Sequence, residues 1–218
     1  MLRKNIMRLV TFSDYEKYVA VQRTTLSKRG MGPYFNTVQI QKDCDWLRRF
    51  LGREVKNGVC HGARNGLECD EFKKHFPEAH VFGTDLFPFS GRSAKHRGTS
   101  EVFECDFSEP NPDWTSQFDF VYSNSLDHAR DPAATVQLWL SQLKPEGCLL
   151  LDWTPSHTVV SGGDDFGASL WEWVQLGNLV GRTVELIYSK VEWKGPNRRS
   201  LESVVMCISP NKNCHFPL

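Results

Sequence analysis

The sequence lacks an excess of charge of either sign and lacks any long apolar run. Lys and Arg together number 26, and Asp and Glu together number 26, so the formal net charge is zero at pH 7. This balance argues against a broad nucleic-acid-binding surface, because such surfaces are strongly basic. The start, MLRKNIMRLV, is basic, but its apolar part is too short for a secretory signal, and no run is long enough to cross a bilayer. We therefore expect a cytoplasmic protein without a membrane partner.

Paired-cysteine motifs are also missing. The seven cysteines are scattered, odd in number, and never form C-x-x-C. Several lie in apolar runs, where a reduced thiol behaves as a small hydrophobe, and this usage is typical of a reducing compartment. Cys60, His61 and Cys69 lie near one another, but no second cluster has the spacing of zinc ligands. We expect no metal site.

Internal repeats and low-complexity linkers are absent too, and the pattern of the chain changes near residue 50. Residues 1–49 are predicted to form an N-terminal helical arm, with helices beginning near residues 15 and 37 and a Gly-Met-Gly-Pro break at 30–33 between them. Residues 50–218 are predicted to form one domain that binds the ligand. The arm is expected to pack on this domain.

The domain alternates between strands and helices. Strands are predicted over 54–61, 79–88, 101–107, 116–128 and 148–153, and helices over 65–76, 131–147 and 167–181. Two further strands, 182–193 and 200–210, flank a Gly-Pro-Asn turn and must form a hairpin. The pattern predicts an α/β, Rossmann-like, doubly wound sheet of about seven strands, mostly parallel, with an antiparallel terminal hairpin. We expect the antiparallel strand to lie at one edge of the sheet.

Polar residues follow the predicted strands at their carboxyl ends, where open α/β sheets bind ligands. The turn after the first strand reads Gly62-Ala63-Arg64-Asn65-Gly66. Its two glycines allow a tight turn and bring backbone N–H groups close to a ligand at a helix N-terminus. The second and third glycines of a dinucleotide fingerprint are missing, and Arg64 hinders the approach of a diphosphate. The turn predicts a nucleoside-like ligand without a diphosphate.

In order and spacing, these segments resemble class I S-adenosylmethionine (SAM)-dependent methyltransferases from about residue 55 to 155, and less closely to 209. The glycine turn matches the first motif in its G-x-R-x-G form, and SQFDFVYSNSLDHARDP and LKPEGCLLLDW are similar to later motifs. The resemblance implies that Asp85 in GTDLFP holds both ribose hydroxyls, and that Asp106 and Phe107 in ECDFSE contact the adenine. With their neighbours, the implied SAM contacts are His61, Gly62, Ala63, Arg64, Gly66, Asp85, Leu86, Cys105, Asp106, Phe107 and Asn124.

Two positions depart from the family pattern. Many relatives carry an acid at the position of His61, and that acid binds the methionine ammonium group of the cofactor. Since His61 has no carboxylate, we expect the ammonium group to be held elsewhere, for example by backbone carbonyls near Asn124. Arg64 replaces a common glycine and could pair with the methionine carboxylate or with Glu68.

The resemblance implies methyl transfer, an in-line displacement that chiefly requires alignment and the exclusion of water. If the acceptor is a hydroxyl, a general base assists, and the candidates for this catalytic role are His128, Asp127 and His157. We expect a small-molecule or carbohydrate acceptor methylated at oxygen, with the Gly- and Ser-rich loop 154–169 as a substrate lid. There are two main alternatives: methylation of RNA or protein, and a methyltransferase-like domain that binds a ligand or partner without catalysis. A nicotinamide dehydrogenase fits the glycine turn less well.

Overall fold

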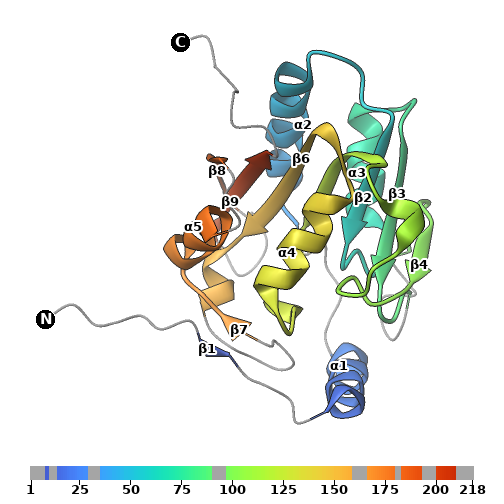
Figure 1. Cartoon of the computed structure of the whole chain (residues 1–218), viewed down its shortest axis with the longest axis vertical. Helices are drawn as coiled ribbons and strands as arrows, with labels where there is room; N and C mark the ends of the chain where they lie inside the picture. The colour runs from blue at the N-terminus through green and yellow to red at the C-terminus, as the bar shows by residue number, and fades with distance from the viewer. Residues whose placement is uncertain are drawn as a thin grey trace, which may run out of the picture.

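A seven-stranded sheet forms the centre of the fold (Figure 1). The computed structural model describes residues 8–9, 14–28, 35–89, 97–158, 166–179, 183–192 and 200–209. Along the sheet the strands run in the order β4-β3-β2-β5-β6-β9-β8. Their bounds are β2 Asn57–His61, β3 His80–Asp85, β4 Val102–Glu104, β5 Phe118–Ser123, β6 Leu143–Trp153, β8 Thr183–Glu192 and β9 Ser200–Ser209.

Strand direction confirms the mostly parallel sheet and its terminal hairpin. The strands β2 to β6 are mutually parallel, whereas β9 runs antiparallel to both of its neighbours, β6 and β8. The antiparallel strand therefore lies one place inside the edge, and the prediction of an antiparallel edge strand was wrong. A hairpin fixes only the relative direction of its two strands, so the sequence pattern did not show which of them pairs with β6.

Helices cover both faces of the sheet. The helices α2 (Thr37–Leu51) and α3 (Leu67–His75) pack on one face, and α4 (Pro132–Ser141) and α5 (Leu170–Leu179) pack on the other. Adjacent strand residues divide between the two cores: Tyr122 packs on the α2 side and Val121 on the α4 side. This alternation explains why the central strands read as continuous apolar runs.

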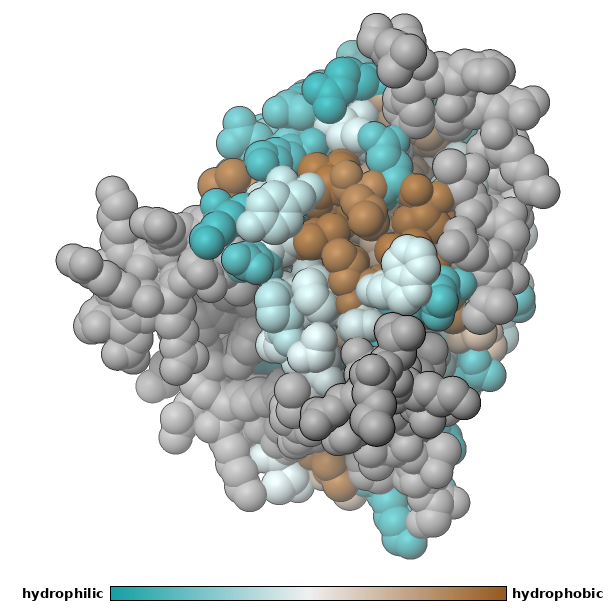
Figure 2. Space-filling model, turned by 90° about the vertical axis from the view of Figure 1, so that its left-hand side faces the viewer, coloured by the Kyte–Doolittle hydropathy of each residue, from teal (hydrophilic) through white to brown (hydrophobic). Residues whose placement is uncertain are grey.

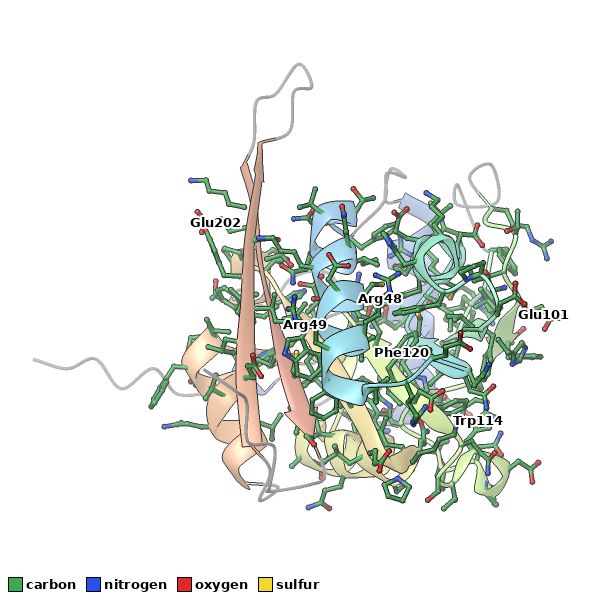
Figure 3. The ribbon with its side chains drawn as sticks, turned by 90° about the horizontal axis from the view of Figure 1, so that it is seen from above. Arg48, Arg49, Glu101, Trp114, Phe120 and Glu202 are labelled. Carbon is green, nitrogen blue, oxygen red and sulfur yellow. The ribbon has the colours of Figure 1, made fainter. Side chains whose placement is uncertain are left out.

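The helix α2 is part of the core, because its buried face includes Ile40 and Leu47, both fully buried. It lies between α3 and the β8–β9 hairpin (Figure 3). The Asn36 side chain accepts hydrogen bonds from the N–H groups of Val38 and Gln39 at its start, and Gly52, with a φ of 59°, ends it. By contrast, α1 (Tyr15–Lys28) lies apart from the sheet, near the carboxyl ends of the parallel strands (Figure 1). The predicted break at 30–33 falls outside the described residues.

Three local predictions differ from the structure. The helix predicted over 131–147 ends at Ser141, and β6 begins at Leu143; Pro145 lacks the N–H that a continuing helix needs. The strand predicted over 116–128 ends at Ser123 and is followed by a short 3-10 helix, Leu126–His128. The predicted loop 154–169 contains the 3-10 helix Pro155–Thr158 and the strand β7 (Phe166–Gly167), which pairs with β1 (Arg8–Leu9). A further 3-10 helix spans Pro112–Trp114, and residues 159–165 lie outside the described part.

Apolar side chains gather on the face seen in Figure 2. On β8, Leu186 and Tyr188 are 47% and 54% exposed. The order of the sheet places β8 at its end, so one side of this strand has no partner within the sheet.

Candidate active site

The turn between β2 and α3 enters the left-handed backbone region three times. Gly62 and Gly66 have φ angles of 75° and 76°, and Arg64 between them has a φ of 40°. A Cβ atom on Gly62 would lie 2.5 Å from the Cβ of Ser125, so both the backbone angle and the packing require glycine there. The turn therefore brings its backbone against the residues that follow β5.

Asp85 ends β3 opposite this turn. One carboxylate oxygen accepts a hydrogen bond from the Arg64 N–H at 2.9 Å, and the other accepts one from the Phe87 N–H at 2.8 Å. Burial raises the pKa of Asp85, while these hydrogen bonds and the Arg64 guanidinium act in the opposite direction. Since each carboxylate oxygen can accept more than one hydrogen bond, the group still has acceptor sites for a ligand.

A pocket opens between the glycine turn, the end of β3 and the residues that follow β5. Five of the predicted SAM contacts line it: Gly62, Arg64, Asp85, Leu86 and Phe107. His128, predicted as a catalytic residue, also lines it. Sequence reasoning missed the other lining residues, which are Tyr18, Gln22, Phe87 and Ser125. Ser125 lies within the motif-like stretch SNSLDH and could have been found there, whereas nothing in the pattern of α1 marked Tyr18 or Gln22.

The helix α1 covers this pocket. The Tyr18 hydroxyl donates to the backbone carbonyl of His128 at 3.0 Å, and Nε2 of Gln22 lies 3.0 Å from Nδ1 of His128. The guanidinium of Arg23 lies over the Phe87 ring, 4.9 Å from its centre. The free volume of the pocket is about 60 Å³, well below the roughly 300 Å³ or more of typical ligand pockets. We therefore expect α1 to move when a larger ligand binds.

Most of the remaining predicted contacts lie next to the pocket but do not line it. Ala63 is 2% exposed, and the Cys105 N–H donates to the backbone carbonyl of Asp85. The Asp106 carboxylate accepts from the Ser108 N–H at 2.8 Å, as a residue that caps a turn does. Gly66 precedes α3 as its N-cap. Asn124 accepts a hydrogen bond from the Ser125 hydroxyl at 3.0 Å.

The His61 side chain points into the core instead. Nδ1 lies 2.8 Å from the Thr84 hydroxyl and Nε2 lies 2.8 Å from Oε1 of Gln142, so both ring nitrogens have partners. The ring stacks on Trp139, with centres 5.0 Å apart. Burial lowers the pKa of His61 to about 4, so the ring is neutral at pH 7. Its side chain joins β2 to β3 and to the end of α4.

The three catalytic candidates do not form one site. Only His128 lines the pocket. Asp127 is 7% exposed, and its Oδ1 has no hydrogen-bond partner among the described residues. His157 accepts from the Thr154 N–H at 3.1 Å and stacks on Trp173 with ring centres 5.3 Å apart. These contacts fix His157 as a packed ring at the start of loop 154–169.

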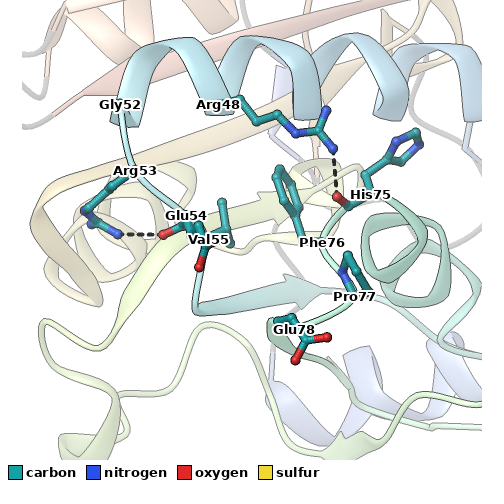
Figure 4. Close-up of a pocket in the computed structure, with 9 residues that line it drawn as sticks. All are labelled: Arg48, Gly52, Arg53, Glu54, Val55, His75, Phe76, Pro77 and Glu78. Atoms are coloured by element: carbon teal, nitrogen blue, oxygen red, sulfur yellow. Dashed lines mark hydrogen bonds between the residues drawn. The ribbon is translucent and has the colours of Figure 1, made fainter.

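A second and larger pocket, of about 500 Å³, lies at the opposite edge of the sheet (Figure 4). It lies between the ends of α2 and α3, where Arg48 donates to the carbonyl of His75 at 2.7 Å and Arg53 donates to the carbonyl of Glu54 at 3.2 Å. This edge carries the amino ends of the parallel strands, whereas open α/β sheets bind ligands at the carboxyl ends. None of the predicted site residues lines it.

Within the described ranges, no group of three or more His, Cys, Asp or Glu side chains is arranged to hold a metal ion. In the same ranges, none of the helices combines the length and the apolar character needed to traverse a bilayer.

Comparison with known proteins places this site in a class. Residues 59–151 match the model of the methyltransferase domain family. A search of curated proteins finds no match. The strand order and the carboxyl-edge pocket, together with this match, define a class I methyltransferase domain. The matched residues are similar to those of SAM-dependent methyltransferases, which are enzymes.

Solved structures with this fold align with between 80% and 94% of this chain. The 1,6-didemethyltoxoflavin-N1-methyltransferase of Burkholderia thailandensis, solved with 1,6-didemethyltoxoflavin and S-adenosylhomocysteine, has a TM-score of 0.63 at 16% identity, covering 94% of this chain and 95% of that one. Magnesium protoporphyrin IX methyltransferase from Synechocystis, solved with SAM, has a TM-score of 0.61 at 11% identity, covering 91% and 100%. DesVI of Streptomyces venezuelae has a TM-score of 0.54 at 14% identity, covering 80% and 92%.

The residues around the pocket fit this cofactor. Gly62 and Arg64 belong to the pocket wall, and Asp85 holds a fixed carboxylate of the kind that accepts hydrogen bonds from a vicinal diol. Phe107 adds an apolar ring to the pocket wall. The volume of about 60 Å³ is the mismatch, and we expect α1 to move when the cofactor binds.

We predict that His61 makes the stability of the fold depend on pH. Because burial lowers its pKa to about 4 from an ordinary 6.5, its contribution is fully present above pH 6.5 and is lost as the pH falls toward 4. We compare the free energies of unfolding of the wild type and of His61→Gln. The advantage of the wild type should be larger at pH 7 than at pH 4, by up to about 3 kcal/mol. Urea denaturation at both pH values measures this, with the exposed His80→Gln as control; a difference independent of pH would contradict it.

We also predict that α1 controls the release of S-adenosylhomocysteine. The double variant Tyr18→Phe, Gln22→Ala removes the hydrogen bonds between α1 and His128, each worth about 1 kcal/mol. The dissociation rate, followed by tryptophan fluorescence after rapid dilution, should rise by roughly tenfold or more. Thr24→Ala, on the exposed side of the same helix, should leave this rate unchanged. An equal rise in both variants would mean that helix stability, and not contact with His128, sets the rate.

Proposed function

We propose that this enzyme transfers a methyl group from SAM to a hydroxyl group of a small molecule or sugar. The observation that supports this most directly is the carboxyl-edge pocket, which joins a carboxylate suited to ribose, Asp85, to an imidazole, His128. Bound SAM supplies an electrophilic methyl group on a positively charged sulfur. The chain itself binds, orients and shields the reactants, and it accepts a proton from the acceptor.

Binding is assigned to the glycine turn and the end of β3. Asp85 is already fixed by two backbone N–H groups, so its oxygens can accept the two ribose hydroxyls with little loss of side-chain entropy. Phe107 packs against the adenine side, and Asp106 follows β4 beside it. His61 has no part in this binding through its side chain, because both ring nitrogens are used in the core.

The helix α1 shields the site. In the closed form, Tyr18 and Gln22 reach across the pocket to His128 and leave space for only a few water molecules. Once the cofactor lies beneath a returned α1, the helix excludes bulk water from the reacting atoms. Exclusion of water strengthens the electrostatic interactions that hold the reactants in line.

His128 is assigned the role of general base at Nε2. Its Nδ1 contacts the Gln22 side-chain amide. If the amide nitrogen donates to Nδ1, the ring hydrogen lies on Nε2, and that atom cannot accept a proton. The base therefore requires the amide to turn so that its oxygen accepts from Nδ1–H. In this arrangement Gln22 sets the tautomer of His128.

The acceptor class is supported by charge and by analogy. The chain is neutral overall, which favours a small acceptor over a nucleic acid. The Burkholderia structure contains a small-molecule substrate, 1,6-didemethyltoxoflavin, although that protein is named for methylation at N1. The choice of oxygen in this chain therefore rests on His128 alone.

The ribose assignment predicts a specific loss of affinity. The Asp85→Asn variant should bind 5′-methylthioadenosine about tenfold or more weakly, because it removes charge-assisted hydrogen bonds to the diol. Calorimetry should also show that the wild type prefers this ligand over its 2′-deoxy analogue and that the variant has lost this preference. Circular dichroism checks that the variant is folded, and Asp113→Asn, a surface change, is the control. Folded wild-type protein that takes up neither SAM nor S-adenosylhomocysteine would refute the proposed function.

The acceptor assignment is tested with methyl-labelled SAM and a panel of small alcohols, sugars and amines. We expect label transfer to a hydroxyl compound, and we expect His128→Asn to slow it about 100-fold or more, since a general base contributes that much. His157→Asn is the matched control and should retain transfer, because that ring stacks on Trp173 outside the pocket. Transfer to amines only, or loss in His157→Asn but not in His128→Asn, would contradict oxygen methylation by His128.

A further inference from the structure

A buried carboxylate lies beside the pocket without a full set of partners. Glu68 is the second residue of α3 and is 6% exposed. The Asn124 side chain hydrogen-bonds to it. Its Oε2 atom is fully buried and has no hydrogen-bond partner among the described residues. Buried carboxylate oxygens normally have partners, so this one indicates a missing group.

Glu68 is connected to the pocket through its neighbours. The Ser125 hydroxyl donates to Oδ1 of Asn124 at 3.0 Å, which leaves the Asn124 amide nitrogen for Glu68. The charges of Arg64 and Asp85 act on Glu68 as well. Ser125, Arg64 and Asp85 all line the pocket. The carboxylate therefore lies behind the pocket wall, between the glycine turn and the end of β5.

A hydrogen-bond donor with a positive charge would suit this oxygen of Glu68. Burial, more than any other influence, raises the pKa of Glu68 to about 7, so the ionised form is poorly stabilised in the ligand-free protein. An ammonium group brought to Oε2 would provide both charge and hydrogen-bond donors. The end of β2 has no acid for such a group, because Cys60 is buried with its pKa raised and the His61 ring faces Trp139.

We propose that Glu68 binds the methionine ammonium group of SAM, and that Arg64 pairs with the methionine carboxylate. The two side chains start four positions apart, at the turn and the first turn of α3, and present opposite charges to a zwitterion. This assignment rests on the proposed function, since it takes the ribose to be held by Asp85. It replaces the family's acid at the end of the first strand with an acid from the following helix.

The test compares two ligands by calorimetry. S-adenosylhomocysteine carries the ammonium group, and 5′-methylthioadenosine has the same adenosine thioether without the amino-acid end. We expect Glu68→Gln to weaken binding of the first by about tenfold or more and to leave the second within about twofold. Glu71→Gln, on the same helix and paired with Lys74, should change neither. Equal effects of Glu68→Gln on both ligands, or no effect on either, would overturn the proposal.

A wild-type protein that binds neither ligand would instead refute the proposed function, so the two failures are distinguishable. Stability gives a second measurement. Because Gln removes a buried, partly paired charge, ligand-free Glu68→Gln should melt above the wild type at pH 8. A lower melting temperature would show that the carboxylate is already satisfied within the protein and would overturn the assignment.

The pH dependence of the wild type needs no variant. The ionisable groups that interact electrostatically with Glu68 are Arg64 from the turn, Asp85 from β3, Cys60 from β2 and Tyr122 from β5. Burial raises the pKa of Cys60 and that of Tyr122, so both groups stay neutral. Affinity for S-adenosylhomocysteine should therefore increase between pH 6 and 8 as Glu68 ionises around its pKa of about 7. The affinity for 5′-methylthioadenosine should stay flat. Parallel profiles for the two ligands would count against a bond between Glu68 and the ammonium group.

Discussion

The bond between the Asp85 carboxylate and the Arg64 N–H sets the geometry of the whole site. It holds a turn that includes a non-glycine residue in the left-handed region, which is unfavourable for an isolated chain. The same carboxylate fixes the chain after β3 through the Phe87 N–H. One half-buried carboxylate thus aligns two neighbouring strand ends, and both pocket walls depend on it.

The sheet could be predicted from the sequence because its central strands are buried on both sides. Val121 and Tyr122 are adjacent and fully buried on opposite faces, which leaves no alternative to a two-sided parallel strand. The position of β9 could not be predicted in this way, because a hairpin pattern is the same whichever of its strands joins β6. The end of α4 was misplaced because the apolar run continues across Pro145 into β6.

Residues of the candidate site were predictable only where the backbone requires a particular residue type or where a strand ends. Gly62 and Asp85 meet these conditions. His61 also ends a strand, but the strand's pleat turns its ring toward Trp139, and local sequence carries no sign of that partner 78 positions away. Tyr18 and Gln22 were missed for the same reason, since their contacts with His128 join segments more than 100 positions apart.

The interior place of β9 has a consequence for synthesis of the chain. On the ribosome β6 is made long before Ser200–Ser209, so its outer side has no neighbour while β8 and residues 193–199 are added. An unpaired strand of this length invites association with other nascent chains. The buried side chains of β6 that await β9 include Leu149 and Leu151. The sheet is therefore complete only when this late segment pairs with both β6 and β8.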